Sequence, residues 1–176
     1  MKAWFDCEFT DLAAPELLSV GIVAERGDEL YVELLDPTLE SHSTDFVRDT
    51  VLPMFGLVYG ARADSYADLA TRACEFLLGL NEPVLLIFDY AADRELLEHA
   101  LERAPRWAEL RNRVTWELAP TTVYCSDIGP ATMEKVWHEE EMDGLGRHHA
   151  LSDARALRAA CIAVHQSTDS WWKQAD

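Results

Sequence analysis

The sequence predicts an α/β protein. Three strand-like segments come first in the chain, and a helix, a strand and further helices follow them, which is an α/β order of elements. Of the 176 residues, 49% are hydrophobic and 27% are charged, as in an ordinary globular protein. This length is typical of one domain, so we expect residues 1–176 to form a single domain.

The first three strands are expected before residue 36. Residues 3–9 (AWFDCEF) have the composition of a short strand, and residues 17–25 and 29–35 have that of two more. Arg26-Gly27-Asp28 lies between the second and third segments and is typical of a turn, so these two strands should form a hairpin.

The next segment is expected to be mostly irregular and to end in a helix. Residues 36–64 contain several prolines and glycines, and we expect only a short helix there, around residues 45–48. Residues 65–80 place apolar side chains at helical spacing, with Ser65 as the N-cap.

The second half of the chain is expected to be mainly helical around one buried strand. That strand is residues 83–90, a short continuous apolar run, and a weaker strand is expected at 122–124. Residues 142–147 contain two glycines and predict a loop. Helices are expected at 93–103, 130–138 and 150–166.

The charge balance excludes one class of nucleic-acid-binding protein. Fifteen Lys and Arg stand against 32 Asp and Glu, which gives a net charge of −17. Such a chain cannot bind duplex nucleic acid through a broad basic face. A nucleic-acid function would therefore require metal ions, a short substrate or a local basic patch.

The sequence predicts a cytoplasmic protein that does not bind membranes. No apolar signal core follows Met1, and no stretch reaches the ~20 apolar residues of a membrane span. The four cysteines are far apart and have apolar neighbours, so we expect reduced thiols, most of them in the core.

Carboxylates at three places depart from an ordinary core pattern. Asp6 and Glu8 are two residues apart in a strand, so both point to one face, where they repel each other unless a cation lies between them. Asp93 and Asp153 each begin a helical stripe that is otherwise apolar. One alternative is that the strand face of Asp6 and Glu8 is solvated. The other is that Asp93 and Asp153 are helix N-terminal residues whose charge interacts favourably with the helix dipole. Divalent cations bound by these four carboxylates would explain why they lie among apolar residues.

Three motifs together resemble those of the DEDDh 3′→5′ exonuclease superfamily, which includes RNase T, oligoribonuclease and polymerase proofreading domains. They are Asp6-Cys-Glu8 in a strand, Asp93 at the start of a helix, and His148-His-Ala-Leu-Ser-Asp153 near the C-terminus. The third motif is the most specific, because a His, four residues and an Asp select His148 rather than His149.

Two further segments bear on this resemblance. Asp89 stands where members of the superfamily often have Asn, so we expect it to support the site rather than to bind metal. Residues 46–53 (FVRDTVLP) and the early hairpin resemble the small stand-alone mycobacterial-type exoribonuclease group.

The resemblance implies an RNase H-like fold, with a central mixed sheet of about five strands flanked by helices, the first three antiparallel. It also implies hydrolysis with two Mg²⁺ or Mn²⁺ ions about 3.5–4 Å apart. Asp6 would bridge both ions, Glu8 and Asp153 would hold the ion that carries the water, and Asp93 would hold the other. His148, whose free pKa is about 6.5, would take the proton of the water. The products would be 5′-mononucleotides from single-stranded RNA 3′ ends.

Substrate contacts are expected from four residues. Phe9 could stack on a base, although alternation along the strand places it on the face opposite Glu8. Leu12 and Leu18 could wedge the terminal base, and Arg147 could bind a phosphate.

Two alternatives of the same fold are left open. One is a DNA 3′→5′ exonuclease, because the preference for RNA depends on the resemblance alone. The other is a protein that binds nucleic acid or a partner without cutting, although the presence of all five motif residues argues against it. The expected partners are single-stranded RNA 3′ ends or short oligonucleotides and, because relatives often dimerise, a second copy of the chain.

Overall fold

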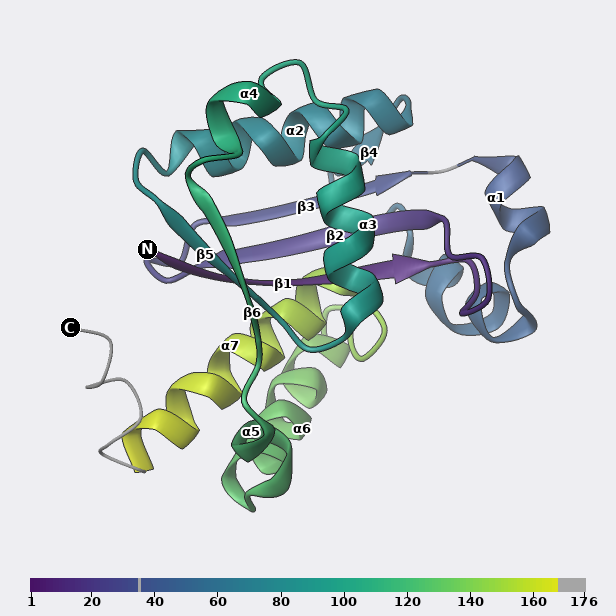
Figure 1. The fold of residues 1–176 in the computed structure, drawn as a ribbon. Coiled ribbons are helices and arrows are strands. Elements are labelled where there is room, and N and C mark those ends of the chain that lie inside the picture. Colours follow the sequence, from purple (N-terminus) through teal and green to yellow (C-terminus); the bar gives the residue numbers. More distant parts are fainter. Residues whose placement is uncertain (35, 168–176) are drawn as a thin grey trace.

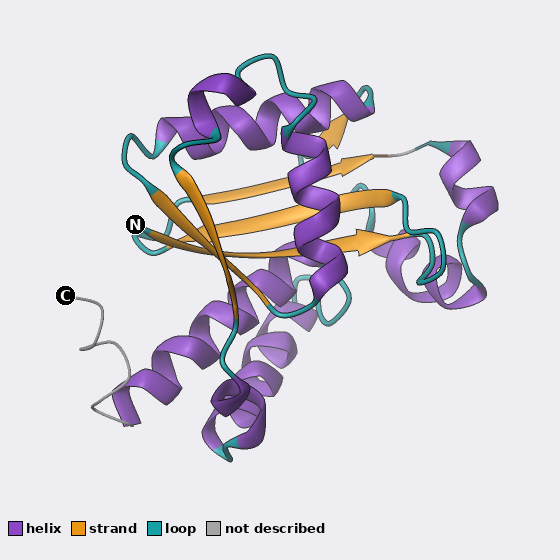
Figure 2. Ribbon diagram, in the orientation of Figure 1, coloured by secondary structure: helices purple, strands orange, loops and turns teal. Residues whose placement is uncertain are grey.

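A six-stranded mixed sheet lies at the centre of the computed structural model, which describes residues 1–34 and 36–167 (Figures 1 and 2). The strand order is β4-β3-β2-β1-β5-β6. β1, β2 and β3 are antiparallel neighbours, β5 and β6 run parallel to β1, and β4 is parallel to β3. The strands are β1 (Lys2–Phe9), β2 (Leu17–Ala24), β3 (Glu29–Leu34), β4 (Arg62–Ala63), β5 (Val84–Phe88) and β6 (Val114–Leu118). The predicted α/β class is confirmed, with six strands rather than about five.

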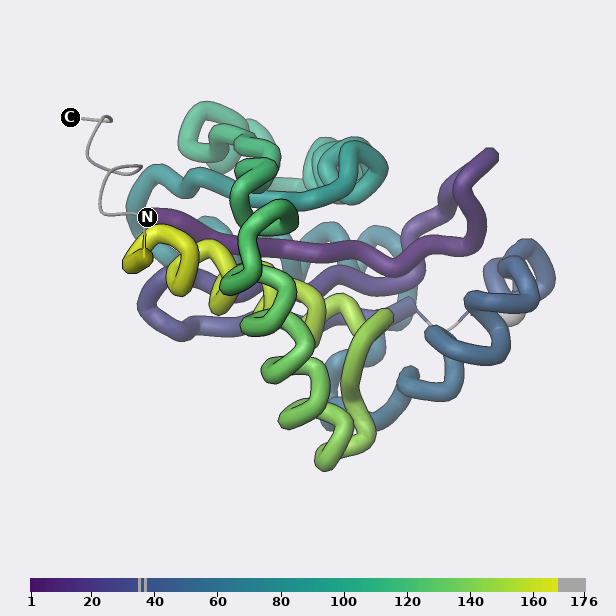
Figure 3. Tube along the Cα trace, turned by 90° about the horizontal axis from the view of Figure 1, so that it is seen from below, coloured from purple at the N-terminus to yellow at the C-terminus, as the bar shows by residue number. Residues whose placement is uncertain are grey.

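Helices cover both faces of the sheet (Figure 1). α2, α3 and α4 lie on one face, and α7 runs across the other, with α6 packed against α7 (Figure 3). No helix among the described residues is long and apolar enough to cross a membrane. The helices are α1 (Pro37–His42), α2 (Tyr66–Gly79), α3 (Ala91–Leu101), α4 (Trp107–Leu110), α5 (Thr121–Cys125), α6 (Ile128–Glu141) and α7 (Ala150–Ser167), with helical turns η1 (Val47–Val51) and η2 (Leu52–Met54).

Alternation along β1 divides its side chains between the two faces. Phe5 and Cys7 are buried in the apolar cluster that includes α2 and α3. Trp4 belongs instead to the cluster that includes Leu157 and Cys161 of α7. Because successive side chains of a strand point to opposite faces, Asp6 and Glu8 lie on the α7 side with Trp4.

Helix α7 packs very closely on the sheet at Gly21. Gly21 of β2 pairs with Asp6 of β1. A Cβ atom at position 21 would lie 2.4 Å from the backbone of Ala150 and of Leu151, at the start of α7. The missing side chain therefore lets the first turns of α7, which carry Asp153, approach the strand that carries Asp6.

Most of the predicted elements are present. Ser65 caps α2 as expected, because its Oγ accepts a hydrogen bond from the Asp68 N–H at 3.2 Å. The short helix expected around residues 45–48 corresponds to η1, while α1 was not expected. The predicted third strand agrees with β3, except that its last residue, Leu35, lies outside the described residues.

The strand predicted at 122–124 is wrong. These residues belong to α5, because the Val123 N–H donates to the carbonyl of Pro120 at 2.9 Å and closes a helical turn. The Val123 side chain is buried against α6 and α7, so tertiary packing outweighs the β-propensity of this segment. The last strand of the sheet is β6, which pairs with β5 along its whole length.

Candidate active site

A cavity of about 1210 Å³ opens at the carboxyl end of β1. Its wall comes from the ends of β1 and β5, the starts of α3 and α7, one side of α6 and the segment around Phe46. All the predicted catalytic and metal-binding residues line it: Asp6, Glu8, Asp93, His148 and Asp153. The fold thus brings together residues that are up to 147 positions apart in the sequence.

One group of acidic side chains comes from adjacent parallel strands. Asp6, Asp89 and Asp93 each offer a carboxylate oxygen within 4.8 Å of the others. Asp89 directly follows β5, the neighbour of β1, and Asp93 lies in the first turn of α3. Asp93 is only 2% exposed, and its Oδ2 has no hydrogen-bond partner among the described residues. We call these three residues the strand group.

A second group connects β1 to α7. Ligand atoms of Glu8, His148 and Asp153 also lie within 4.8 Å of one another. Both carboxylate oxygens of Asp153 accept hydrogen bonds, one from the indole N–H of Trp137 and one from the backbone N–H of His148 at 2.9 Å. We call Glu8, His148 and Asp153 the helix group.

The carboxylates of both groups hold protons more tightly than usual. Burial, and then the charges of Asp153 and Asp93, raise the pKa of Asp6 well above its ordinary value. Burial likewise raises the pKa of Glu8. The pKa of Asp93 rises to about 8 through burial and then through the charge of Asp89. The pKa of Asp153 rises to about 7 through burial, which its two hydrogen bonds partly oppose.

These features fit divalent cations. Repulsion among crowded carboxylates and an unpartnered buried oxygen are both relieved by a positive ion, and hard ions such as Mg²⁺ prefer oxygen ligands. The predicted metal-binding carboxylates Asp6, Glu8, Asp93 and Asp153 are the residues that would hold the ions, and Asp89 lies beside Asp6 and Asp93. In the sequence, Asp89 lies near the end of the predicted strand at 83–90, and the resemblance favoured a supporting role for it.

His148 lines the cavity beside Glu8 and Asp153. Burial, and then the charge of Arg147, lower the pKa of the His148 imidazole below its ordinary value. The ring is therefore neutral at pH 7, as a general base must be. Its edge contacts the exposed ring of Phe46, with the ring centroids 4.9 Å apart. The backbone of His148 is left-handed, with φ 68°.

His149 has a different position from its neighbour. It is 1% exposed, and its ring packs on that of Tyr31 with centroids 4.2 Å apart. Burial lowers its pKa to about 4, so the ring is neutral. His149 does not line the cavity, as expected from the motif spacing.

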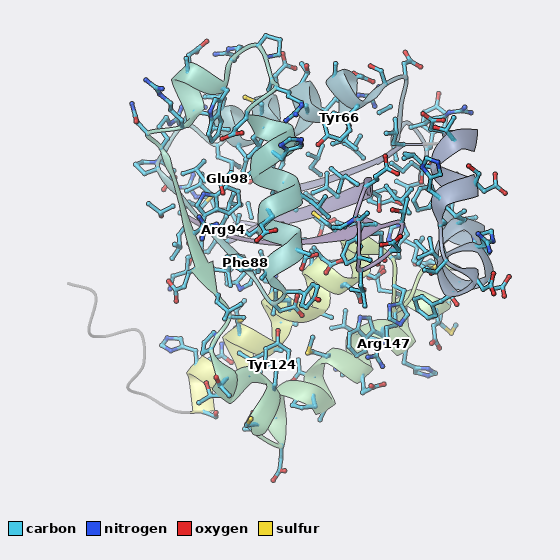
Figure 4. All side chains as sticks on the ribbon, turned by 45° about the vertical axis from the view of Figure 1, so that its right-hand side comes forward. Tyr66, Phe88, Arg94, Glu98, Tyr124 and Arg147 are labelled. Carbon is cyan, nitrogen blue, oxygen red and sulfur yellow. The ribbon has the colours of Figure 1, made fainter. Side chains whose placement is uncertain are left out.

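Arg147 and Trp137 form one wall of the cavity. The Arg147 guanidinium lies over the Trp137 ring, 4.9 Å from its centroid. The indole N–H of Trp137 also donates a hydrogen bond to Asp153, so Trp137 contacts both the Arg147 guanidinium and the helix group. Figure 4 shows Arg147 below the strands, on the side of the molecule where α5 to α7 lie.

Of the other predicted substrate contacts, Phe9 and Leu12 line the cavity and Leu18 does not. Phe9 packs against the apolar cluster of Phe5 and Cys7, the face that alternation predicts, and it reaches the cavity at the end of β1, where the pairing with β2 shifts register. Its ring lies nearly parallel to that of Tyr90, with centroids 6.4 Å apart. Leu12 is 75% exposed at the rim. Leu18 is 1% exposed in the core on β2, so its expected contact with substrate is wrong.

Comparison with known proteins adds no assignment. No family model matches the chain, and no curated protein matches it. The geometry of the cavity is therefore the evidence on which a function can be proposed.

Proposed function

We propose that this protein is a metal-dependent 3′→5′ exoribonuclease with an RNase H-like fold of the DEDDh type. The observation that carries the proposal is the division of the acidic residues of the cavity into two groups that meet on one strand, Asp6 in one and Glu8 in the other. Two ion sites side by side on a shared strand are the arrangement that two-metal phosphodiester hydrolysis requires.

The residues of the chain would divide the chemistry as follows. Asp6 and Asp93 would hold one cation, and Glu8 and Asp153 would hold the second. Bound there, the ions would supply charge stabilisation for the attacking and leaving oxygens of the phosphodiester. His148 would accept the proton of the attacking water at its imidazole nitrogen, which the lowered pKa leaves free at neutral pH.

The rest of the cavity favours a short single-stranded end over a duplex. Among its lining residues, Arg147 is the one Lys or Arg side chain, so few phosphates could be bound by basic residues. Phe9, Tyr90 and Phe46 present rings on which unpaired bases could stack. The acidic lining comprises Asp6, Glu8, Asp11, Asp89, Asp93, Glu134 and Asp153.

End-labelled RNA tests the proposal. A short single-stranded RNA labelled at its 5′ end should be shortened stepwise with Mg²⁺ or Mn²⁺ and should release 5′-mononucleotides, and EDTA should stop the reaction. DNA of the same sequence, under the same conditions, measures the sugar preference. The control variant is Glu134→Gln, which changes a carboxylate that lines the cavity outside both groups and should cleave as the wild type does. Cleavage that persists in EDTA, or no cleavage with either ion, would contradict the proposal.

A further inference from the structure

We propose that Asp89 is a metal ligand in its own right, and that the Tyr124 hydroxyl holds its carboxylate in place. This inference rests on the proposed metal centre and extends it, because the resemblance implied only a supporting role for position 89. Three observations carry it: the register of two strands, an unpartnered oxygen and the contact with Tyr124.

The register of β1 and β5 places Asp89 beside Asp6. The two strands are parallel, and Lys2, Ala3 and Trp4 pair with Leu85, Leu86 and Ile87, always 83 residues further along the chain. The same offset from Asp6 leads to Asp89, immediately after β5 ends at Phe88. Paired residues of parallel strands point to the same face, so the two carboxylates are directed into the same space.

That space also receives an unpartnered oxygen. Only 2% of Asp93 is exposed, and its Oδ2 lacks a hydrogen-bond partner among the described residues. A buried carboxylate oxygen without a partner is costly, and a cation is the ligand that satisfies it. The oxygens of Asp6, Asp89 and Asp93 lie within 4.8 Å of one another, so a cation bound to Asp93 would also meet the carboxylate of Asp89.

Tyr124 distinguishes Asp89 from an incidental acidic neighbour. The Tyr124 hydroxyl, on α5, interacts with the Asp89 carboxylate, and both residues line the cavity. Residues that hydrogen-bond to metal ligands orient them, and their loss typically lowers metal affinity by about 10–100-fold. Figure 4 shows Tyr124 below the strands, on the same side as Arg147. We therefore assign Tyr124 as a positioning residue for the strand group.

The two assignments predict how metal binding responds to substitution. Metal-free protein is titrated with Mn²⁺, and the free ion is followed by electron paramagnetic resonance to give the number of sites and the Kd of each. Asp89→Asn keeps the shape of the side chain and removes its charge. It should weaken one Mn²⁺ site by at least tenfold and leave the other unchanged. Tyr124→Phe should weaken the same site by a smaller factor, and Asp89→Glu, which retains a carboxylate, should bind more tightly than Asp89→Asn.

Two controls separate ligation from a structural effect. Glu134→Gln removes a cavity carboxylate outside both groups and should bind Mn²⁺ like the wild type. Thermal unfolding in EDTA should show that Asp89→Asn is at least as stable as the wild type, because one repelling charge has been removed. The stabilisation of Asp89→Asn by added Mn²⁺ should be smaller than that of the wild type.

The outcomes distinguish this inference from the proposed function. If Asp89→Asn binds Mn²⁺ with wild-type affinity at every site, Asp89 is not a ligand, and the exonuclease proposal is unaffected. If the wild type binds no Mn²⁺, both proposals are overturned. If Mn²⁺ binding changes as expected but RNA is not cleaved, the Asp89 assignment stands and the exonuclease proposal is wrong.

Discussion

The strand group and the helix group differ in what holds their carboxylates in place. Asp153 of the helix group accepts one hydrogen bond at each oxygen, from Trp137 and from the backbone of His148. In the strand group, Asp93 has an oxygen with no partner among the described residues. Hydrogen bonds within the protein therefore hold Asp153 of the helix group in place. In the strand group, a bound cation would supply the partner that the Asp93 oxygen lacks.

This difference has an origin in the fold. The strand group lies on neighbouring parallel strands and the helix turn that follows one of them, so its residues are close once β1 and β5 pair. The helix group requires α7 to dock on β1 and β2, which depends on tertiary packing at Gly21. The hydrogen bonds of Asp153 fix a carboxylate whose position the sheet alone does not determine.

Asp6 should show the largest effect on activity, because it lies on the strand that both groups share. We expect Asp6→Asn to abolish detectable RNA cleavage and to raise the melting temperature in EDTA, since the substitution removes a crowded buried charge. Cleavage assays and thermal unfolding of the same preparation measure both effects. Robust cleavage by Asp6→Asn would show that the two groups do not act as one centre.

His148 should show the next largest effect, and it separates catalysis from metal binding within the helix group. His148→Ala should lower the rate of cleavage by about 10²–10⁴-fold, the usual contribution of a general base, while the variant still binds Mn²⁺. Because the pKa of His148 is lowered, wild-type activity should rise with pH below about 6.5 rather than above it.

The matched control for His148 is its neighbour. His149→Ala leaves the base in place but opens a space beside Tyr31, so it should lower the melting temperature and spare the rate of the folded protein. If His149→Ala were inactive and His148→Ala near wild type, the assignment of the third motif would be wrong.

Gly21→Ala should move Asp153 away from Glu8 and leave the strand group in place. The added Cβ would overlap the backbone of Ala150 and Leu151, so α7 must move away from β2 and take Asp153 with it. We expect a cost of about 1–3 kcal/mol in the free energy of unfolding, a weaker Mn²⁺ site and reduced cleavage. Gly79→Ala at the end of α2, where nothing lies within 4 Å of the added Cβ, is the control and should change neither metal binding nor cleavage. Two unaltered Mn²⁺ sites in Gly21→Ala would contradict the dependence of the helix group on this contact.

The stability of the metal-free protein should depend on pH. The ordinary pKa of Asp is 3.8, but that of Asp93 is about 8 and that of Asp153 is about 7. Between these values the folded metal-free protein holds protons that the unfolded chain has lost, so the free energy of unfolding falls as pH rises from about 4 to 8. In EDTA the protein should melt at a higher temperature at pH 5 than at pH 8.

Single substitutions assign this pH dependence to the two groups. Asp93→Asn should remove the part of the fall nearest pH 8, and Asp153→Asn the part nearest pH 7. A melting temperature that does not change between pH 5 and pH 8 in EDTA would show that the carboxylates do not repel one another as described. Added Mn²⁺ should stabilise the wild type more at pH 8, where the ligands are ionised.

Local patterns predicted much of this architecture. Alternation in β1 placed Asp6 and Glu8 on one face, and helical stripes identified Asp93 and Asp153 as carboxylates that face the interior. These two features depend on residues close together in the sequence, where a period of two or of 3.6 is informative. The choice of His148, which lines the cavity, over His149, which is buried, came instead from the motif spacing of the family that the chain resembles.

What the patterns missed depends on distant contacts. The proximity of Asp89 to Asp6 follows from the register of two strands about 80 residues apart, which no local period shows. Phe9 reaches the cavity from the end of β1 although it packs against the cluster of Phe5 and Cys7, and the neighbours of β2 on both faces bury Leu18. The segment at 122–124 has β-forming side chains, but its packing against α6 and α7 makes it helical.

The left-handed backbone of His148 has an evolutionary consequence. A non-glycine residue at φ 68° stores strain, typically of about 1–3 kcal/mol. Glycine adopts this conformation without strain, so His148→Gly would relax the backbone at the same position where it removes the proposed base. In a lineage under selection for stability alone, losing catalysis here would carry little penalty. Under the proposed function, a variant that binds RNA ends without cutting them is therefore one substitution away.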